Sequence, residues 1–291
     1  MPKTSKQSFS LSITHLVILF GISALLLIIS LFSKSLSHLK IESTVKLSPS
    51  PGVTSSPSPS PEFVGRSVKV PILTYHYIGN NPNPADKARD NLLVPPDKFE
   101  EQMNYLSTNG YNTISFDTMY AGLKGISPLP PKPIILTFDD GYIDFYINAF
   151  PILRRYNLHA VSFIPTGLIG GGYYMNWSQI KEIDATGLVS FEAHSIHHPS
   201  LPGLSDAELN SELLESKKTL EAELGKPVNF MAYPYGSSDG RVQQAAKGAG
   251  FLGSTGTWSG RVETEGNIYN MPRTKVDGSW KIEQFASYLG L

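Results

Sequence analysis

The chain has 291 residues, of which 41% are hydrophobic, and its 24 Lys and Arg nearly balance its 25 Asp and Glu. This length and composition suit one large hydrophobic core or two small ones. The net charge of −1 and the lack of a basic run give no electrostatic basis for binding nucleic acid. The sequence has no cysteine, which excludes thiolate metal sites, cysteine nucleophiles and a cysteine-linked lipid anchor.

Residues 11–32 contain no Asp, Glu, Lys or Arg and are rich in Leu, Ile, Val and Phe. A run of roughly 20 such residues is long enough to cross a bilayer as one helix. Lysines precede and follow the run, so charge does not decide its orientation. We expect a short tail at residues 1–10 followed by an uncleaved membrane anchor. A cleaved signal peptide is the alternative, although no small-x-small cleavage site follows the run.

Residues 33–66 are expected to form a linker, because the stretch 47–61 is dominated by Ser and Pro. Such a composition builds no packed core, and its repeated prolines favour an extended spacer. At ~3.1 Å per residue, this spacer could hold a domain some ~45 Å from a membrane. We therefore expect a single-pass protein whose globular domain, residues 67–291, lies outside the cytoplasmic membrane, in an extracellular or periplasmic position.

Short apolar runs alternate with helix-period patterns through the globular part of the chain. The expected strands are 70–78, 113–115, 134–138, 160–164, 188–191, 230–233 and 251–254, and the expected helices are 97–109, 144–156, 177–185, 205–224, 239–247 and 279–289. Ser205 and Glu208 have the spacing of a capping box, and Gly110 and Gly225 stand where helix C-caps fall. The alternation predicts a parallel α/β sheet with right-handed crossovers, and about seven units favour a barrel over an open sheet.

The apolar run at 134–138 ends in Asp139 and Asp140, followed by a glycine. Two carboxylates at the mouth of a buried strand are costly unless they are paired or used. In parallel α/β proteins the functional site lies at the carboxyl ends of the strands. Since adjacent strand residues point opposite ways, one aspartate could hold a metal while the other acts as a base. A strand-to-helix cap is the alternative.

Three of the seven histidines, His194, His197 and His198, follow the expected strand at 188–191. His194 and His198 are four residues apart, so one helical turn would place both imidazoles on one face, with His197 pointing elsewhere. Together with one carboxylate they would form a facial metal site with open positions. Such a histidine pair is more often structural, and its coincidence with the paired aspartates favours the metal site.

Two further positions invite a functional interpretation. In the segment 232–236, Ala-Tyr-Pro-Tyr-Gly, proline fixes a turn and Gly236 allows a backbone amide to face the cleft, where it could stabilise an oxyanion. A plain structural turn is the alternative there. His76 interrupts an otherwise apolar and aromatic strand, either as a buried structural histidine or as a general acid that protonates an amine leaving group near neutral pH.

Thr-Phe-Asp-Asp-Gly at 137–141, His-Ser-x-x-His-Pro at 194–199 and Tyr-Pro-Tyr-Gly at 233–236 occur in this order. In these motifs the chain resembles, from about Val68 to Leu291, the polysaccharide deacetylases of carbohydrate esterase family 4, or NodB-homology domain. The resemblance implies a distorted (β/α)7-type barrel that hydrolyses N-acetyl groups, a hydrolase of linear amide C–N bonds. It also implies a divalent metal, Zn²⁺ in the first place, with Co²⁺, Ni²⁺ and Fe²⁺ also compatible. The site residues carried over by position are Asp139 as the base, Asp140, His194 and His198 as metal ligands, and the Tyr235 amide in an oxyanion hole.

Two departures from the family pattern refine this expectation. Ala232 stands where many members have an arginine that orients the base, and no histidine follows His198, although many members place their acid near the C-terminus. Both features resemble the branch that deacetylates poly-β-1,6-N-acetylglucosamine, where a Tyr-His of the first strand supplies the acid. By this likeness His76 would be the acid and Arg273 would replace the missing arginine. The expected partner is thus an acetylated extracellular polysaccharide; peptidoglycan, chitin oligomers, acetylated xylan, or a glycan-binding module without turnover are the alternatives.

Overall fold

The computed structural model describes residues 66–81 and 85–290. The expected anchor at 11–32 and nearly all of the expected linker at 33–66 lie outside these residues. Within the described ranges, no helix is both long and apolar enough to cross a membrane.

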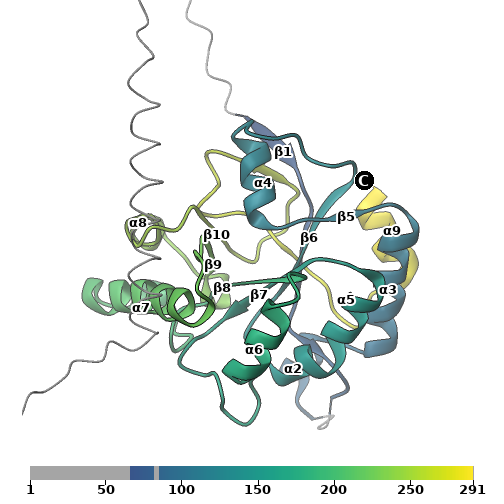
Figure 1. Ribbon diagram of the computed structural model, residues 1–291, viewed down its shortest axis with the longest axis horizontal. Helices are drawn as coiled ribbons and strands as arrows, with labels where there is room; N and C mark the ends of the chain where they lie inside the picture. The colour runs from purple at the N-terminus through teal and green to yellow at the C-terminus, as the bar shows by residue number, and fades with distance from the viewer. Residues whose placement is uncertain (1–65, 82–84, 291) are drawn as a thin grey trace, which may run out of the picture. The chain divides into compact units, whose positions relative to one another are not determined.

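A parallel sheet of eight strands forms the centre of the described part (Figure 1). Its strands are β2 (Ile72–Tyr75), β5 (Asn112–Thr113), β6 (Pro133–Phe138), β7 (Ala160–Ile164), β8 (Val189–Ala193), β9 (Phe230–Ala232), β10 (Gly253–Thr255) and β12 (Thr274–Lys275). The strand order is β10-β9-β8-β7-β6-β2-β12, with β5 beside β6. The last strand, β12, therefore lies next to the first, β2.

The sheet curls without closing into a continuous barrel. Next to β10 the chain is held by an isolated parallel bridge, Thr255–Met271, before it continues into β12. The predicted parallel α/β fold is confirmed, and the observed form is a curled, partly open barrel.

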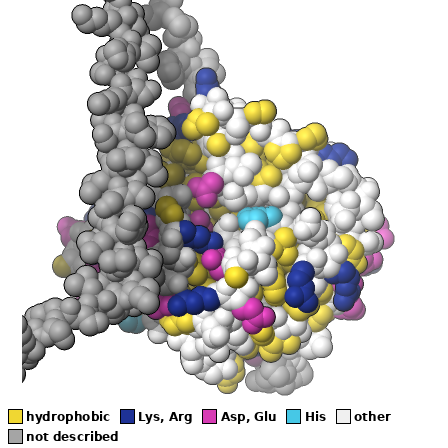
Figure 2. Space-filling view, in the orientation of Figure 1, with side chains coloured by type: hydrophobic (Ala, Val, Ile, Leu, Met, Phe, Trp, Pro, Cys, Tyr) yellow, Lys and Arg dark blue, Asp and Glu magenta, His cyan; other side chains and the backbone are white. Residues whose placement is uncertain are grey.

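Helices surround this sheet, as Figure 1 shows for α3, α5, α6 and α7. Their bounds are α2 (Lys87–Asp90), α3 (Pro96–Thr108), α4 (Phe116–Leu123), α5 (Phe150–Tyr156), α6 (Trp177–Asp184), α7 (Asp206–Leu224), α8 (Gly240–Gly248) and α9 (Ile282–Gly290). Short elements complete the fold: β1 (Ser67–Lys69) pairs antiparallel with β11 (Val262–Thr264), β3 (Tyr77–Ile78) pairs with β4 (Leu93–Val94), and single turns lie at η3 (Leu201–Gly203) and η4 (Pro234–Gly236). On the face shown in Figure 2, basic, acidic and hydrophobic side chains are interspersed.

The alternation of side chains along β6 separates two hydrophobic clusters. Ile134, Leu136 and Phe138 pack outward against the helices, whereas Ile135 packs inward. Inside the curl, Phe116 of α4 packs in a hydrophobic cluster with residues of β2, β7 and β9. This cluster fills one end of the curled sheet. Because successive strand residues alternate between faces, Thr137 and Asp139 share the inner face with Ile135. Asp139 directly follows β6 and therefore lies at the open end of the curled sheet, opposite the end that the cluster fills.

Three of the differences between the predicted and the observed elements have a clear physical reason. The expected strand 70–78 is two strands that separate at His76, where β3 leaves the main sheet to pair with β4. The expected strand 113–115 ends early, because the Ser115 side chain accepts a hydrogen bond from the Thr118 amide and caps α4, a helix that was not predicted.

The third difference is the expected helix 144–156. It begins as a π-helix, η2 (Phe145–Ala149), which continues into α5. Pro151, near the start of α5, has no backbone N–H to donate and its ring clashes with an α-helical carbonyl. A wider π turn ahead of it relieves this conflict. The capping box of Ser205 and Glu208 is confirmed, as is the left-handed C-cap at Gly225, with φ +67°.

Candidate active site

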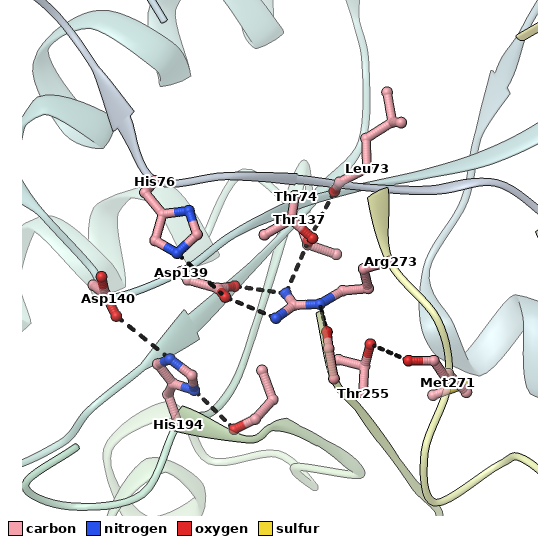
Figure 3. A network of polar contacts seen from close by, with 12 residues as sticks. Leu73, Thr74, His76, Thr137, Asp139, Asp140, His194, Thr255, Met271 and Arg273 are labelled. Carbon is pink, nitrogen blue, oxygen red and sulfur yellow. Dashed lines mark hydrogen bonds and ion pairs between the residues drawn. The ribbon is translucent and has the colours of Figure 1, made fainter. Parts of the chain in front are cut away.

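Three predicted metal ligands converge at the open end of the sheet. Single ligand atoms of Asp140, His194 and His198 lie within 4.8 Å of one another. Asp140 Oδ1 is 3.4 Å from Nε2 of His194 and 3.2 Å from Nε2 of His198. Figure 3 shows the His194 ring turned toward Asp140. Asp140 follows β6 and both histidines follow β8, so two strand ends and one loop build the cluster.

The predicted helical turn at His194–His198 is wrong, because the segment is an irregular loop. Ser195 and His198 have left-handed backbones, with φ +64° and +59°. The Ser195 hydroxyl accepts a hydrogen bond of 3.0 Å from the His198 amide, which stabilises the reversal. The two imidazole rings still meet, with centroids 4.7 Å apart. The tight bend of this loop therefore brings the two imidazole rings together, as a helical turn was expected to do.

The orientation of His194 is fixed from behind. Its Nδ1 lies 2.7 Å from the carbonyl oxygen of Ala232, which can only accept, so Nδ1 carries the hydrogen and Nε2 presents its lone pair to the cluster. Buried beside two carboxylates, His194 has its pKa lowered by loss of hydration, but Asp140 and Asp139 outweigh that effect and raise it. The same negative potential would attract a metal cation placed between the three ligand atoms.

Asp139 lines the same cleft beside this cluster and is held by Arg273. Two guanidinium nitrogens of Arg273 donate to the two carboxylate oxygens of Asp139 at 2.7 and 2.8 Å. Arg273 itself is fully buried, and it also donates to the Thr137 hydroxyl and to the Gly256 carbonyl. Figure 3 shows this fork. Burial alone would raise the pKa of Asp139, but the charge and hydrogen bonds of Arg273 hold it below its ordinary value.

His76 closes the other side of Asp139. Its Nε2 is 3.9 Å from Asp139 Oδ2, and Figure 3 shows the ring directed at that carboxylate. Burial lowers the pKa of His76, against the attraction of Asp139 and Asp140, which raises it. Burial has the larger effect, so the pKa of His76 lies below its ordinary value, while the two carboxylates favour the proton that a general acid must carry.

Tyr235 lies at the rim of the same cleft, with its ring edge-on to His198 at 4.6 Å. Its backbone is left-handed, with φ +59°. In the turn η4, Pro234 has no N–H, Gly236 donates to Tyr233 and Ser237 donates to Pro234. Among the described residues, the Tyr235 amide is therefore the donor of this turn that forms no backbone hydrogen bond. This is the position expected for an oxyanion donor.

Sequence reasoning missed the residues that support the cluster. Glu212 on α7 accepts hydrogen bonds from the amides of Ile196 and His197 at 2.8 and 3.0 Å, and from the His197 ring at 2.7 Å. It thereby ties down the loop between the two metal-cluster histidines, and His197 stays outside the cluster as predicted. In the sequence Glu212 is one more acidic residue of an amphipathic helix, so no local signal marks it. The cleft, about 390 Å³, is lined chiefly by His76, Leu92, Asp139, Asp140, Tyr142, Tyr174, His194, His198, Tyr235 and Thr257.

Comparison with known proteins identifies the family. A family model described as "Polysaccharide deacetylase" matches residues 127–253. The chain is 30% identical over 224 residues to "Putative polysaccharide deacetylase YxkH" of Bacillus subtilis, covering 77% of each protein. It is also 30% identical over 206 residues to a poly-beta-1,6-N-acetyl-D-glucosamine N-deacetylase of Staphylococcus aureus, covering 66% of this chain and 70% of that protein.

A solved structure agrees with these relatives. The Streptococcus pyogenes deacetylase PplD, in complex with acetate, superposes with a TM-score of 0.71 at 31% identity, over 76% of this chain and 98% of that one. The chain therefore belongs to the polysaccharide deacetylase family, the carbohydrate esterase family 4 or NodB-homology group. Its members are enzymes that remove N-acetyl groups from polysaccharides.

Proposed function

We propose that this chain is a metal-dependent hydrolase that removes N-acetyl groups from N-acetylglucosamine units of an extracellular polysaccharide of the poly-β-1,6-linked type. One observation carries the proposal: a buried carboxylate held by a bidentate arginine lies beside an Asp-His-His cluster. The Staphylococcus aureus relative, which is named for this polysaccharide, supports the choice of substrate.

The cluster fits a divalent cation on its chemistry. One carboxylate oxygen and two imidazole nitrogens are suitable ligands for Zn²⁺, Co²⁺, Ni²⁺ or Fe²⁺. The backing hydrogen bond from His194 to Ala232 is the kind of support that metal-binding histidines usually have. Asp140, His194 and His198 would hold the ion, with zinc as our first choice. A bound ion would supply Lewis acidity toward the acetyl carbonyl and acidify a nearby water.

Two different residues of the chain carry out the two proton transfers of the reaction. Asp139 is the general base and takes the proton of the attacking water, while Arg273 fixes its orientation and keeps it ionised. The Tyr235 amide donates to the oxygen that gains negative charge. His76, within 3.9 Å of Asp139, is the general acid that gives a proton to the departing amine. Acetate and a free glucosamine unit result.

Acetate release by the purified full chain tests this proposal. We expect release from poly-β-1,6-N-acetylglucosamine, its loss after chelation and its recovery when Zn²⁺, Co²⁺, Ni²⁺ or Fe²⁺ is returned. Asp139→Asn and His76→Ala should each lower kcat by at least about 100-fold with the metal retained. Asp206→Asn is the matched control, since this exposed carboxylate at the start of α7 pairs with Arg241 and does not line the cleft.

Other outcomes would point to the alternatives. Release from peptidoglycan, chitin oligomers or acetylated xylan, and none from the β-1,6-linked polymer, would replace the substrate. Metal binding without acetate release from any of these glycans would indicate a binding module. Full activity of Asp139→Asn would contradict the assignment of the base.

We further propose that residues 11–32 anchor the protein in the cell membrane and that the linker at 33–66 presents the domain at 67–291 to its polymer outside the cytoplasm. The charge-free apolar run and the Ser/Pro-rich stretch support this arrangement. Fractionation of cells gives the test: the full chain should sediment with membranes and be released by detergent. A chain lacking residues 1–32 should not sediment.

A further inference from the structure

Among the described residues, the strands β8 and β9 share one backbone pair, Ala193–Met231. The strands on either side are joined more extensively, since β7 and β8 pair along five residues and β9 and β10 along three. His194, one of the proposed metal ligands, directly follows β8, so the short pairing adjoins the proposed metal site. Contacts other than the backbone ladder therefore keep β9 in place at this point.

Two side chains bind the backbone of β9 on either side of that pair. Glu192 Oε2 accepts a hydrogen bond of 2.8 Å from the Phe230 amide. His194 Nδ1 donates to the Ala232 carbonyl oxygen at 2.7 Å. Residues 192 and 194 are two apart in the chain, as are residues 230 and 232, so the two bonds follow the repeat of the strands. Side-chain hydrogen bonds thus hold β9 beside β8 where the backbone pairing is short.

Glu192 is a buried residue on the inner face of the curled sheet. Its neighbours Phe191 and Ala193 pack outward against the helices, so the side chain of Glu192 points inward with that of His194. Burying a carboxyl group is costly unless it forms hydrogen bonds. Glu192 does not line the cleft, and the mechanism proposed above uses none of its atoms. Its contact with β9 gives a physical reason for its presence.

The position of β9 matters for two parts of the proposed site. The Ala232 carbonyl, at the end of β9, holds the His194 ring so that Nε2 faces Asp140. The turn η4, which contains the Tyr235 amide, begins two residues after β9. A shift of β9 relative to β8 would therefore displace the support of a metal ligand and the oxyanion donor together.

We propose that Glu192 is a positioning residue. By accepting from the Phe230 amide it sets the place of β9, and through β9 it sets the orientation of the His194 ring and of the Tyr235 amide. This inference rests on the proposed function and adds that the metal site and the oxyanion hole depend on one residue outside the cleft.

Three substitutions separate the hydrogen-bond acceptor of Glu192 from the bulk of its side chain. Glu192→Gln keeps an oxygen that can accept from the Phe230 amide. Glu192→Leu keeps a similar volume without an acceptor, and Glu192→Asp keeps the carboxyl group on a side chain one methylene shorter. Glu263→Leu is the matched control, because it removes another buried glutamate, on β11, which does not line the cleft.

NMR of the metal-free full chain, labelled with 15N at histidine, reads the orientation of His194 directly. The Nδ1 proton of His194, assigned by its loss in His194→Gln, should exchange slowly in the wild type, in Glu192→Gln and in Glu263→Leu. In Glu192→Leu and Glu192→Asp it should exchange at least about tenfold faster, measured against the backbone amides of β6 in the same protein. That reference separates a local loss of orientation from a general loss of stability.

Zinc affinity, measured by competition titration, gives a second readout. Glu192→Leu and Glu192→Asp should bind zinc at least about tenfold more weakly than the wild type, with Glu192→Gln restoring the affinity to within about twofold. If Glu192→Leu does not fold, Glu192→Asp decides both comparisons. Wild-type exchange and wild-type zinc affinity in Glu192→Asp would overturn the positioning role. If the wild type released no acetate but the NMR pattern appeared, the positioning role would stand and the proposed hydrolysis would fall.

Discussion

Asp139 and Asp140 are neighbours in sequence and have opposite surroundings. Asp139 is matched by a bidentate guanidinium, whereas Asp140 faces two imidazoles. Burial would raise the pKa of Asp140, but its hydrogen bonds with His194 and His198 hold that pKa well below the ordinary value. The left-handed backbone at Asp140, with φ +73°, turns the second carboxylate away from the first. A single strand end can thus supply both a base and a metal ligand.

Replacing Arg273 with lysine tests the importance of the fork at Asp139. Lysine keeps the positive charge but cannot make two parallel hydrogen bonds, so the carboxylate loses its fixed orientation. We expect kcat/KM to fall roughly 100-fold with the bound metal unchanged. Arg261→Lys serves as the control, because Arg261 lies over Tyr288 and away from Asp139. An Arg273→Lys enzyme within twofold of the wild type would rule out the orienting role.

Glu212 offers a second test at the same scale. Glu212→Ala removes the acceptor for two loop amides and the His197 ring, so the loop that carries His194 and His198 should loosen. Supporting groups of this kind are typically worth 10–100-fold in metal affinity, and we expect about tenfold weaker zinc binding by competition titration. Glu215→Ala, on the same helix but exposed and paired with Lys218, should bind zinc as tightly as the wild type. Equal affinities in both variants would contradict the anchoring role.

At the scale of elements, α7 depends on its N-cap. The Ser205 hydroxyl accepts a hydrogen bond from the Glu208 amide, and the Glu208 carboxylate accepts one from the Ser205 amide. Ser205→Ala should lower the free energy of unfolding by about 1 kcal/mol in urea titrations. Ser211→Ala, in the exposed middle of the same helix, should change stability by less or increase it, since alanine is the better helix former. A change of equal size and sign in both variants would show that capping is not the cause.

The elements that the sequence revealed are those with strong local patterns. The strands β6 and β7 are buried on both faces and therefore appear as continuous apolar runs. The strand β12 has only the residues Thr274 and Lys275, and it exists because β2 offers them a partner. The pairing of a two-residue strand is a tertiary effect that no local propensity records.

The same distinction applies to the site. The strand-end motifs identified Asp139, Asp140, His194 and His198, because their chemistry is unusual for positions that follow buried strands. Arg273 was inferred only from the absence of an arginine elsewhere in the motifs. Glu212 gave no signal, since acidic residues are ordinary on the exposed faces of helices. Its role depends on the fold, which brings the loop at 196–197 against α7.

At the scale of the whole molecule, two carboxyl groups that do not line the cleft, Glu192 and Glu263, are buried and form no ion pair among the described residues. Burial raises the pKa of Glu192 and of Glu263 to about 8 each. Glu192 accepts a hydrogen bond from the Phe230 amide, whereas neither oxygen of Glu263 has a partner among the described residues. A carboxyl group whose pKa is higher in the folded state stabilises the fold fully below its unfolded pKa, near 4.5, and this contribution is lost as pH rises toward 8.

Glu263→Gln should therefore change the pH dependence of stability. The amide cannot ionise, so near pH 5 the variant and the wild type should unfold at similar urea concentrations. Near pH 8.5 the variant should be the more stable, by up to a few kcal/mol, on the order of what such a pKa difference allows. Glu265→Gln is the control, because Glu265 is paired with Lys124, which lowers its pKa. A constant difference between Glu263→Gln and the wild type across this range would contradict the prediction.

The pairing of β12 with β2 also means that the sheet cannot be completed until the C-terminal part of the chain has been synthesised. Most sheet neighbours are close in sequence, but the Leu73–Thr274 pairing joins nearly opposite ends of the described chain. A nascent chain still attached to the ribosome carries Asp139 long before Arg273 has emerged. Contacts between such distant segments form slowly, since a long loop must be closed first. We therefore expect translation products that stop before Arg273 to be inert and prone to aggregation, even though they contain every proposed metal ligand.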